Sequence, residues 1–288
     1  MLQHIINGLV SGMVYSLLAI GFALVYNTTH IFHIAAAGIY VFAAYMFWLF
    51  SVTLGLPLVF AAALAILLTM GLSLLSEVSI YRPLRKKNSS LNAIMIASIG
   101  LMMIIVNIIT LVFGNESKVV TKSIGKTFLV GNLIITTPQL IKVIVAVVAI
   151  SVFLALLART TFGIRVRALS SDETLFETLG YDKQRSFSIV FLVSGLFIGL
   201  ASCVRAYDVS LDPNMGMSVL INAMVAMIIG GNGKFWTCVA GGLVLGVLQS
   251  ITVNWFDSSW QNAITFALLL GFLFLRPQGI AGYKQRAV

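Results

Sequence analysis

The sequence predicts an all-α fold, a polytopic bundle that crosses a lipid bilayer about eight or nine times. Two observations support this prediction: 59% of the 288 residues are hydrophobic and only 9% are charged, and the mean hydropathy is +1.03. A soluble domain carries roughly 25% charged residues, so this chain could not cover its surface in water. In lipid, helices satisfy their backbone hydrogen bonds internally. We therefore expect one transmembrane domain over 1–288 and no separate soluble domain.

The predicted spans are read from apolar runs in chain order. The first is long for a secretion signal and no clear cleavage site follows it, so we expect it to be a mature membrane helix. Most runs are long enough to cross the hydrocarbon core of a bilayer. The runs are 5–27, 31–53, 57–79, 91–113, 139–158, 186–206, 216–231, 235–254 and 260–275.

The second and seventh runs are interrupted. The second follows a polar stretch at 27–30 and contains small residues at 35–38, and the seventh is short and ends in Gly-Gly-Asn-Gly at 230–233. Such runs are typical of broken or re-entrant helices, which are tolerated where they are buried or line a cavity. For the seventh run, a tight turn between ordinary helices is an equally good interpretation.

We expect the solute path to follow these irregular segments, although plain helix packing explains the same residues equally well. The candidate path residues are Tyr26, Asn27, His33, Gly38, Asn222 and Met224.

The distribution of Lys and Arg predicts the orientation of the chain. Positive charges cluster at 80–88, at 159–185 and at the C-terminus, and such clusters mark cytoplasmic loops. The loop 114–138 is then external, although three lysines within it weaken the rule. Its alternating pattern around Gly-Asn at 131–132 predicts a small external β-hairpin. Nine spans place the N-terminus outside and eight place it inside.

The cytoplasmic loop 159–185 is predicted to contain a short helix at about 171–179. Ser170 and Glu173 have the spacing of a capping box. Asp172 suits the positive end of the helix dipole, and Gly180 is a natural stop. A helix this short needs a partner surface.

The partner expected for this coupling helix is a cytoplasmic protein. Its apolar contact would come from Leu175, Phe176 and Leu179, with Asp172, Glu173 and Glu177 as an acidic rim and Gly180 as the end of the helix. The alternative is that the helix lies on lipid headgroups. Three acids without a base suit an anionic membrane poorly, so we favour a protein groove.

The sequence lacks the motifs of several kinds of function. There is no phosphate-binding G-x-x-x-x-G-K-[ST] and no H-E-x-x-H, and His30 and His33 have no evident third metal ligand. We therefore expect no cofactor, no metal and no catalysis. The net charge of +9 is assigned to membrane orientation rather than to nucleic-acid binding. Acids are scarce within the spans, so we expect energy for transport to come from another subunit.

Six sequence segments together resemble the permeases of the branched-chain amino acid class of ABC importers, over most of the chain. Each is weak alone, but their order and spacing are specific. They are GLVSGMVYSLLAIG at 8–21, TFGIRVRA at 161–168 followed by Leu179-Gly180, DPNMG at 212–216, IGGNG at 229–233, GGLVLG at 241–246 and RPQGIAG at 276–282.

The chain departs from the family pattern in three places. The family typically reads Asn-Phe-Ala-His-Gly-Glu where this chain has HIAAAG at 33–38, Phe176 stands where a small residue is usual, and KFW at 234–236 replaces small residues. The chain therefore resembles a divergent member. Urea, short peptides and aromatic acids stay open as substrates beside branched-chain amino acids.

The resemblance implies a bacterial inner-membrane complex. Its other parts would be a second, homologous permease, two cytoplasmic ATPases and a periplasmic or extracellular solute-binding protein, with membrane lipid around the spans. The implied function is import of a small solute, most simply a branched-chain or other amino acid. The alternative, favoured by the shortage of charge in the spans, is a self-contained channel or facilitator for a small neutral solute such as urea or an amide.

The orientation can be tested with single cysteines at Ser89, Ser123 and Ser171. An impermeant thiol reagent added outside should label position 123 and leave 89 and 171 unlabelled, because the Lys and Arg clusters hold the latter two in the cytoplasm. Labelling at 89 or 171, or protection at 123, contradicts the predicted topology.

Overall fold

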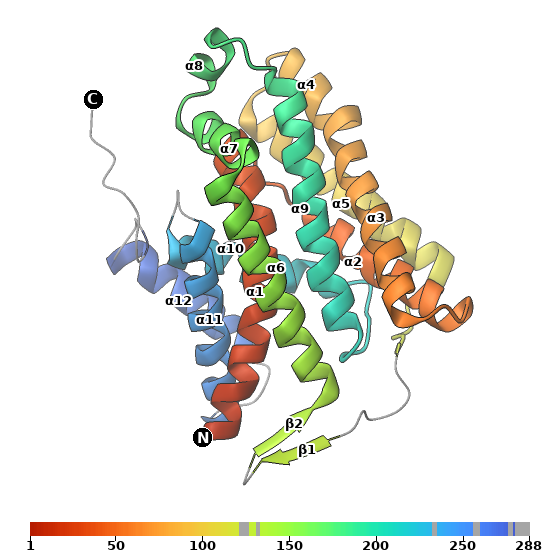
Figure 1. The fold of residues 1–288 in the computed structure, drawn as a ribbon. Helices are drawn as coiled ribbons and strands as arrows, with labels where there is room; N and C mark the ends of the chain where they lie inside the picture. The colour runs from red at the N-terminus through yellow and green to blue at the C-terminus, as the bar shows by residue number, and fades with distance from the viewer. Residues whose placement is uncertain (121–126, 131–132, 232–234, 256–259, 276–278, 280–288) are drawn as a thin grey trace.

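The protein is a bundle of long helices, with a small hairpin at one end and two short helices at the other (Figure 1). The computed structural model describes residues 1–288 except 121–126, 131–132, 232–234, 256–259, 276–278 and 280–288. The predicted polytopic helical bundle is confirmed. Within the described residues, seven helical stretches are long and apolar enough to cross a membrane.

The long helices follow the predicted runs closely. They are α1 (Leu2–Thr29), α2 (Ala36–Trp48), α3 (Leu58–Ser76), α5 (Leu91–Phe113), α6 (Thr137–Arg159), α9 (Lys183–Ala206) and α11 (Phe235–Trp255). Two shorter apolar helices are α10 (Met215–Gly230) and α12 (Trp260–Leu275), and the remaining short helices are α4 (Arg82–Lys86), α7 (Thr161–Ser171) and α8 (Glu173–Thr178). The π-helical turns η1 (Leu49–Thr53) and η2 (Glu77–Tyr81) extend α2 and α3.

Helix α1 forms the centre of the bundle because small residues let α11 approach it closely. A Cβ on Gly12 would lie 2.8 Å from the carbonyl oxygen of Gly242, and one on Gly246 would clash with the backbone of Gly8 and Gly12. Ser16 Oγ also donates to the Val239 carbonyl on α11, at 3.0 Å. Small residues with this spacing are what allows close backbone packing in lipid. Most of α1 is buried as a result, with 83% of its most apolar stretch inside the protein.

Helix α9 packs between α1, α2 and α3 through serine hydroxyls. Ser194 donates to the Gly21 carbonyl at 2.8 Å, Ser202 donates to the Tyr40 carbonyl at 2.6 Å, and Ser73 on α3 donates to the Phe191 carbonyl at 2.7 Å. Each bond satisfies a hydroxyl that would otherwise be unpaired in an apolar interior. These bonds fix α9 against three neighbours at once.

The outer helices α3, α5 and α6 expose apolar side chains. Only 17% of the most apolar stretch of α5 is buried, and its Leu111 is 85% exposed. An isolated soluble protein rarely exposes an apolar surface of this extent. These faces are suited to lipid or to another membrane subunit.

The hairpin predicted within 114–138 is present. Strand β1 (Thr127–Val130) pairs antiparallel with β2 (Leu133–Thr136), and the Gly-Asn turn at 131–132 lies outside the described residues. The Gln3 side chain donates to the Ile134 carbonyl at 2.9 Å and accepts from its N–H at 3.0 Å. The N-terminus therefore lies at the hairpin end of the bundle, opposite α7 and α8 (Figure 1). If the hairpin is external, as the sequence predicts, the N-terminus is external too, as the nine-span alternative expects.

The α1–α11 contact predicts how glycine variants behave. Gly246→Ala should destabilise the folded protein by about 1–3 kcal/mol, because the added methyl group has no space between the two backbones. Thermal unfolding in detergent measures the effect.

Gly71→Ala is the matched control. Gly71 lies in the middle of α3, and a Cβ added there would have no neighbour within 4 Å, so alanine should leave stability unchanged or raise it by about 0.5–1 kcal/mol. Equal stability of the two variants would contradict the central role of this packing.

Candidate functional site

The first break in the helices lies between α1 and α2. His30 adopts a left-handed backbone conformation with φ of 53° and ends α1, and α2 begins only at Ala36. His33 within the break is fully buried, and its Nδ1 lies 2.8 Å from the Tyr81 hydroxyl. That hydroxyl lies 2.8 Å from Ser98 Oγ, which accepts the Ala35 N–H at 2.9 Å. The predicted break is therefore present, and side chains of η2 and α5 bond to the His33 Nδ1 and the Ala35 N–H within it.

Other predicted path residues near this break take part in packing. Tyr26 packs against Phe32 with the two rings tilted and their centroids 4.8 Å apart, and Asn27 is buried. A Cβ on Gly38 would lie 3.2 Å from Ile105 on α5, so this glycine allows α2 and α5 to approach closely. Packing, the alternative weighed from the sequence, accounts for the structural surroundings of these residues.

The second break precedes α10, whose first turn meets the first turn of α2. A Cβ on Gly216 would lie only 2.5 Å from the Ala37 carbonyl oxygen. The second and seventh runs, far apart in the chain, therefore converge on one point. The interruption predicted at the end of the seventh run, at 230–233, lies partly outside the described residues. Sequence reasoning did not select Gly216 as a site residue, although it lies in the DPNMG segment that carries the family resemblance.

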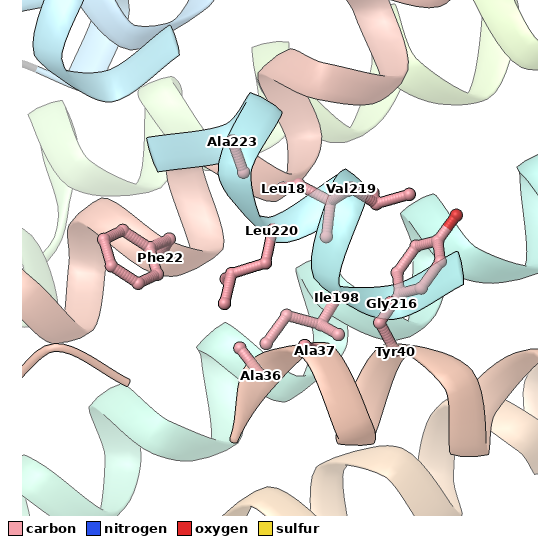
Figure 2. Close-up of a pocket in the computed structure, with 10 residues that line it drawn as sticks. All are labelled: Leu18, Phe22, Ala36, Ala37, Tyr40, Ile198, Gly216, Val219, Leu220 and Ala223. Carbon is pink, nitrogen blue, oxygen red and sulfur yellow. The ribbon is translucent and has the colours of Figure 1, made fainter. Parts of the chain in front are cut away.

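A narrow cavity of about 10 Å³ lies at this convergence, between α1, α2, α9 and α10 (Figure 2). Its walls are apolar apart from the hydroxyl of Tyr40. None of the six predicted path residues lines it, although Ala37 and Ala223 are direct neighbours of Gly38 and Asn222. The lining residues are Leu18, Phe22, Ala36, Ala37, Tyr40, Ile198, Gly216, Val219, Leu220 and Ala223.

A second hollow of about 200 Å³ shares Ala37 and Gly216 with this cavity. It is bordered by α5 and by the segment that leads into α10, and it includes Met102, Met103 and Met217. Flexible methionine side chains adapt to different ligand shapes. The two spaces together surround the meeting point of α2 and α10.

Asn222, a predicted path residue, belongs to a buried polar network. Its Oδ1 accepts from Gln249 Nε2 at 3.0 Å and from Thr265 Oγ1 at 3.2 Å, and Gln249 also donates to Thr265 at 2.5 Å. These side chains join α10, α11 and α12. Met224, two residues further along, is partly buried and packs against the core.

Comparison with known proteins identifies the family. Residues 4–273 match the family described as the branched-chain amino acid transport system permease component. The chain belongs to this permease family.

Relatives of this permease cover almost its whole length. It is 26% identical to the high-affinity branched-chain amino acid transport system permease protein BraD of Pseudomonas aeruginosa, over 98% of this chain and 95% of BraD. It is 28% identical to the corresponding protein LivH of Escherichia coli K12, with the same coverage. The solved PsaBC complex of Streptococcus pneumoniae with Fab shares its fold, with a TM-score of 0.50 and 15% identity over 94% of this chain and 91% of that chain.

The coupling segment of this permease differs from the prediction in its cap. Helix α7 continues through Ser171, so Ser170 is helical and cannot serve as the N-cap of the next helix. Asp172 is the first extended residue, and its Oδ1 accepts from the N–H groups of Thr174 and Leu175 at 2.8 and 2.9 Å. The predicted capping box of Ser170 and Glu173 is therefore wrong. Gly180, with φ of 83°, follows the end of α8.

Leu175, Phe176 and Leu179 were expected to face a partner together, but Phe176 points into its own chain. Phe176 is 1% exposed, packs with Leu169 and Phe187, and stacks on Tyr181 with ring centroids 5.1 Å apart. A helix of six residues has room for one inward anchor, and Phe176 takes that position.

The remaining predicted coupling residues are divided between two environments. Leu175 and Leu179 are 56% and 64% exposed. Of the expected acidic rim, Glu173 is ion-paired with Lys183, Glu177 lies 3.7 Å from the same ammonium group, and Asp172 caps α8. The surface available to a partner is therefore formed chiefly by the two leucines.

The polar network predicts the effect of removing one hydroxyl. Thr265→Val keeps the shape of the side chain but deprives Gln249 and Asn222 of a partner, so stability should fall by about 1 kcal/mol. Thr252→Val is the control, since among the described residues the Thr252 hydroxyl bonds to the Leu248 carbonyl of its own helix and to no other helix. Thermal unfolding in detergent compares the two, and an equal or larger loss at Thr252 would contradict this assignment.

Proposed function

We propose that this permease carries a branched-chain or other amino acid into the bacterial cytoplasm across the inner membrane. The observation that carries the proposal is the apolar cavity at the convergence of α2 and α10, in a chain of the branched-chain amino acid permease family. Discontinuous membrane helices typically meet at transport sites. An apolar wall suits an aliphatic side chain.

The energy for transport comes, in this proposal, from two ATPases that dock at the α7–α8 end. Support comes from the two exposed leucines of this segment and from its position outside the long helices (Figure 1). A solute-binding protein delivers the amino acid at the opposite, hairpin end. A second permease subunit covers part of the apolar surface of α3, α5 and α6.

Reconstitution tests this proposal against a self-contained channel. The permease pair, its ATPases and its binding protein are placed in proteoliposomes, and uptake of labelled leucine is measured. We expect uptake to require ATP, the ATPases and the binding protein together. Leucine or urea entry through the permease alone, without ATP, would establish the channel alternative instead.

The docking surface on α8 predicts the behaviour of a double variant, Leu175→Ser with Leu179→Ser. Burial of one leucine side chain contributes about 1.5–3 kcal/mol. Loss of both contacts should therefore weaken ATPase association at least about tenfold while the thermal stability of the permease stays near that of the native chain. Co-purification at graded ATPase concentrations measures association.

Two further variants complete the comparison. Val209→Ser is a control, because Val209 is 41% exposed at the opposite end of α9, and it should leave association unchanged. Phe176→Ala should lower thermal stability as well as association, since Phe176 anchors α8 to its own chain. The docking proposal is excluded if the double leucine variant retains the ATPase as well as Val209→Ser does.

A further inference from the structure

Arg205 is a cation near the end of a membrane helix without an acidic partner. It occupies the last turn of α9 and is partly buried. The acid one turn away, Asp208, is ion-paired with Lys142 at 2.5 Å, and no carboxylate among the described residues forms an ion pair with Arg205. A charged side chain within a membrane span is costly and is a functional-site hypothesis by default. A guanidinium is suited to bidentate binding of a carboxylate.

Two tyrosines lie near this guanidinium, and Asn222 lies beside one of them. The Tyr15 hydroxyl lies next to both Arg205 and Asn222, and Tyr40 is an electrostatic neighbour of Arg205. Tyr40 is 1% exposed, yet its hydroxyl has no hydrogen-bond partner. A buried hydroxyl without a partner costs about 1–3 kcal/mol, so this group is available to a ligand that enters the site.

Arg205, Tyr15, Tyr40 and Asn222 form a polar cluster next to the apolar cavity. Each lies on the same face of its helix as a residue that lines the cavity, or lines it itself. Residues three or seven positions apart share one face of a helix. Tyr40 belongs to both, with its ring in the wall of the cavity (Figure 2). The cavity residues and their polar partners are Leu18 and Tyr15 on α1, Ile198 and Arg205 on α9, and Val219 and Asn222 on α10.

We propose that Arg205, Tyr15, Tyr40 and Asn222 form a binding site for the carboxylate of the transported solute. The apolar residues around the cavity contact the short aliphatic side chain of the same molecule. The assignment rests on the proposed function, and it deepens that function by stating which chemistry the permease itself recognises. The ligand class is a small carboxylate with a branched or linear aliphatic chain.

A pair of tyrosine variants tests the site. Tyr40 and Tyr45 lie on the same helix, are both fully buried and both have hydroxyls without a partner, but Tyr45 packs on Phe113 and does not line the cavity. Tyr40→Phe should raise the apparent KM for leucine uptake by the assembled importer about five- to tenfold. Tyr45→Phe should remain within about twofold of the native protein, and both variants should unfold at the native temperature.

Arg205 variants and a binding measurement test the charge. Arg205→Gln should lower leucine uptake more than about tenfold, while ATP hydrolysis stimulated by the binding protein persists, and Arg205→Lys should retain more uptake than the glutamine variant. The assembled complex should also be stabilised against heat by 4-methylpentanoate and not by 4-methylpentanamide, and Arg205→Gln should abolish this stabilisation.

The outcomes separate this inference from the proposed function. If the native importer transports no amino acid but is still stabilised by the carboxylate through Arg205, the proposed function fails and the site stands. If leucine uptake is ATP-dependent but Arg205→Gln and Tyr40→Phe match the native protein, the carboxylate site is refuted. If Arg205→Gln does not assemble, the tyrosine pair decides, and equal effects of Tyr40→Phe and Tyr45→Phe overturn the site.

Discussion

The close approach of α1 and α11 is the constraint on which the rest of the bundle depends. Glycines at 8, 12, 242 and 246 remove the side chains that would hold the two backbones apart. Because α1 is thus enclosed, α2, α9 and α10 can gather around its other faces and leave the cavity between them. Precise packing is concentrated at this centre, whereas α3, α5 and α6 keep apolar outer faces that a lipid bilayer tolerates without exact complementarity.

Composition and hydropathy were sufficient to predict the helices, the break before α2 and the hairpin, since each is a local property of the chain. The hydrogen-bond partners of the break at 30–35 were not predictable in the same way. Tyr81 bonds to the His33 Nδ1 of this break and Ser98 accepts the Ala35 N–H, and they lie 48 and 63 residues from these groups. The direction of Phe176 also depends on a distant residue, Phe187 on α9, so helical spacing alone could not reveal it.

One residue of the candidate site could be predicted from the sequence and three could not. Asn222 was selected because it lies in an interrupted run. Tyr15 and Tyr40 were missed because a single tyrosine in a long apolar run looks like ordinary core. Arg205 was not selected from the sequence, although it lies toward the hairpin end, where the positive-inside rule disfavours basic residues. That exception was the available signal, and only the structure places the other polar groups beside it.

Helix α9 connects the two ends of the molecule as one continuous rod. Its first turns hold Lys183 and Phe187, which tie it to α8, and its last turn holds Arg205. The helix of 24 residues is about 36 Å long, contains no proline, and has its glycines at 195 and 199 packed against α3. A bend therefore has no obvious place to form along it. If ATPases displace α8, α9 moves as a rigid helix. A displacement of its first turns is then transmitted along its length to the guanidinium of Arg205 at the other membrane face.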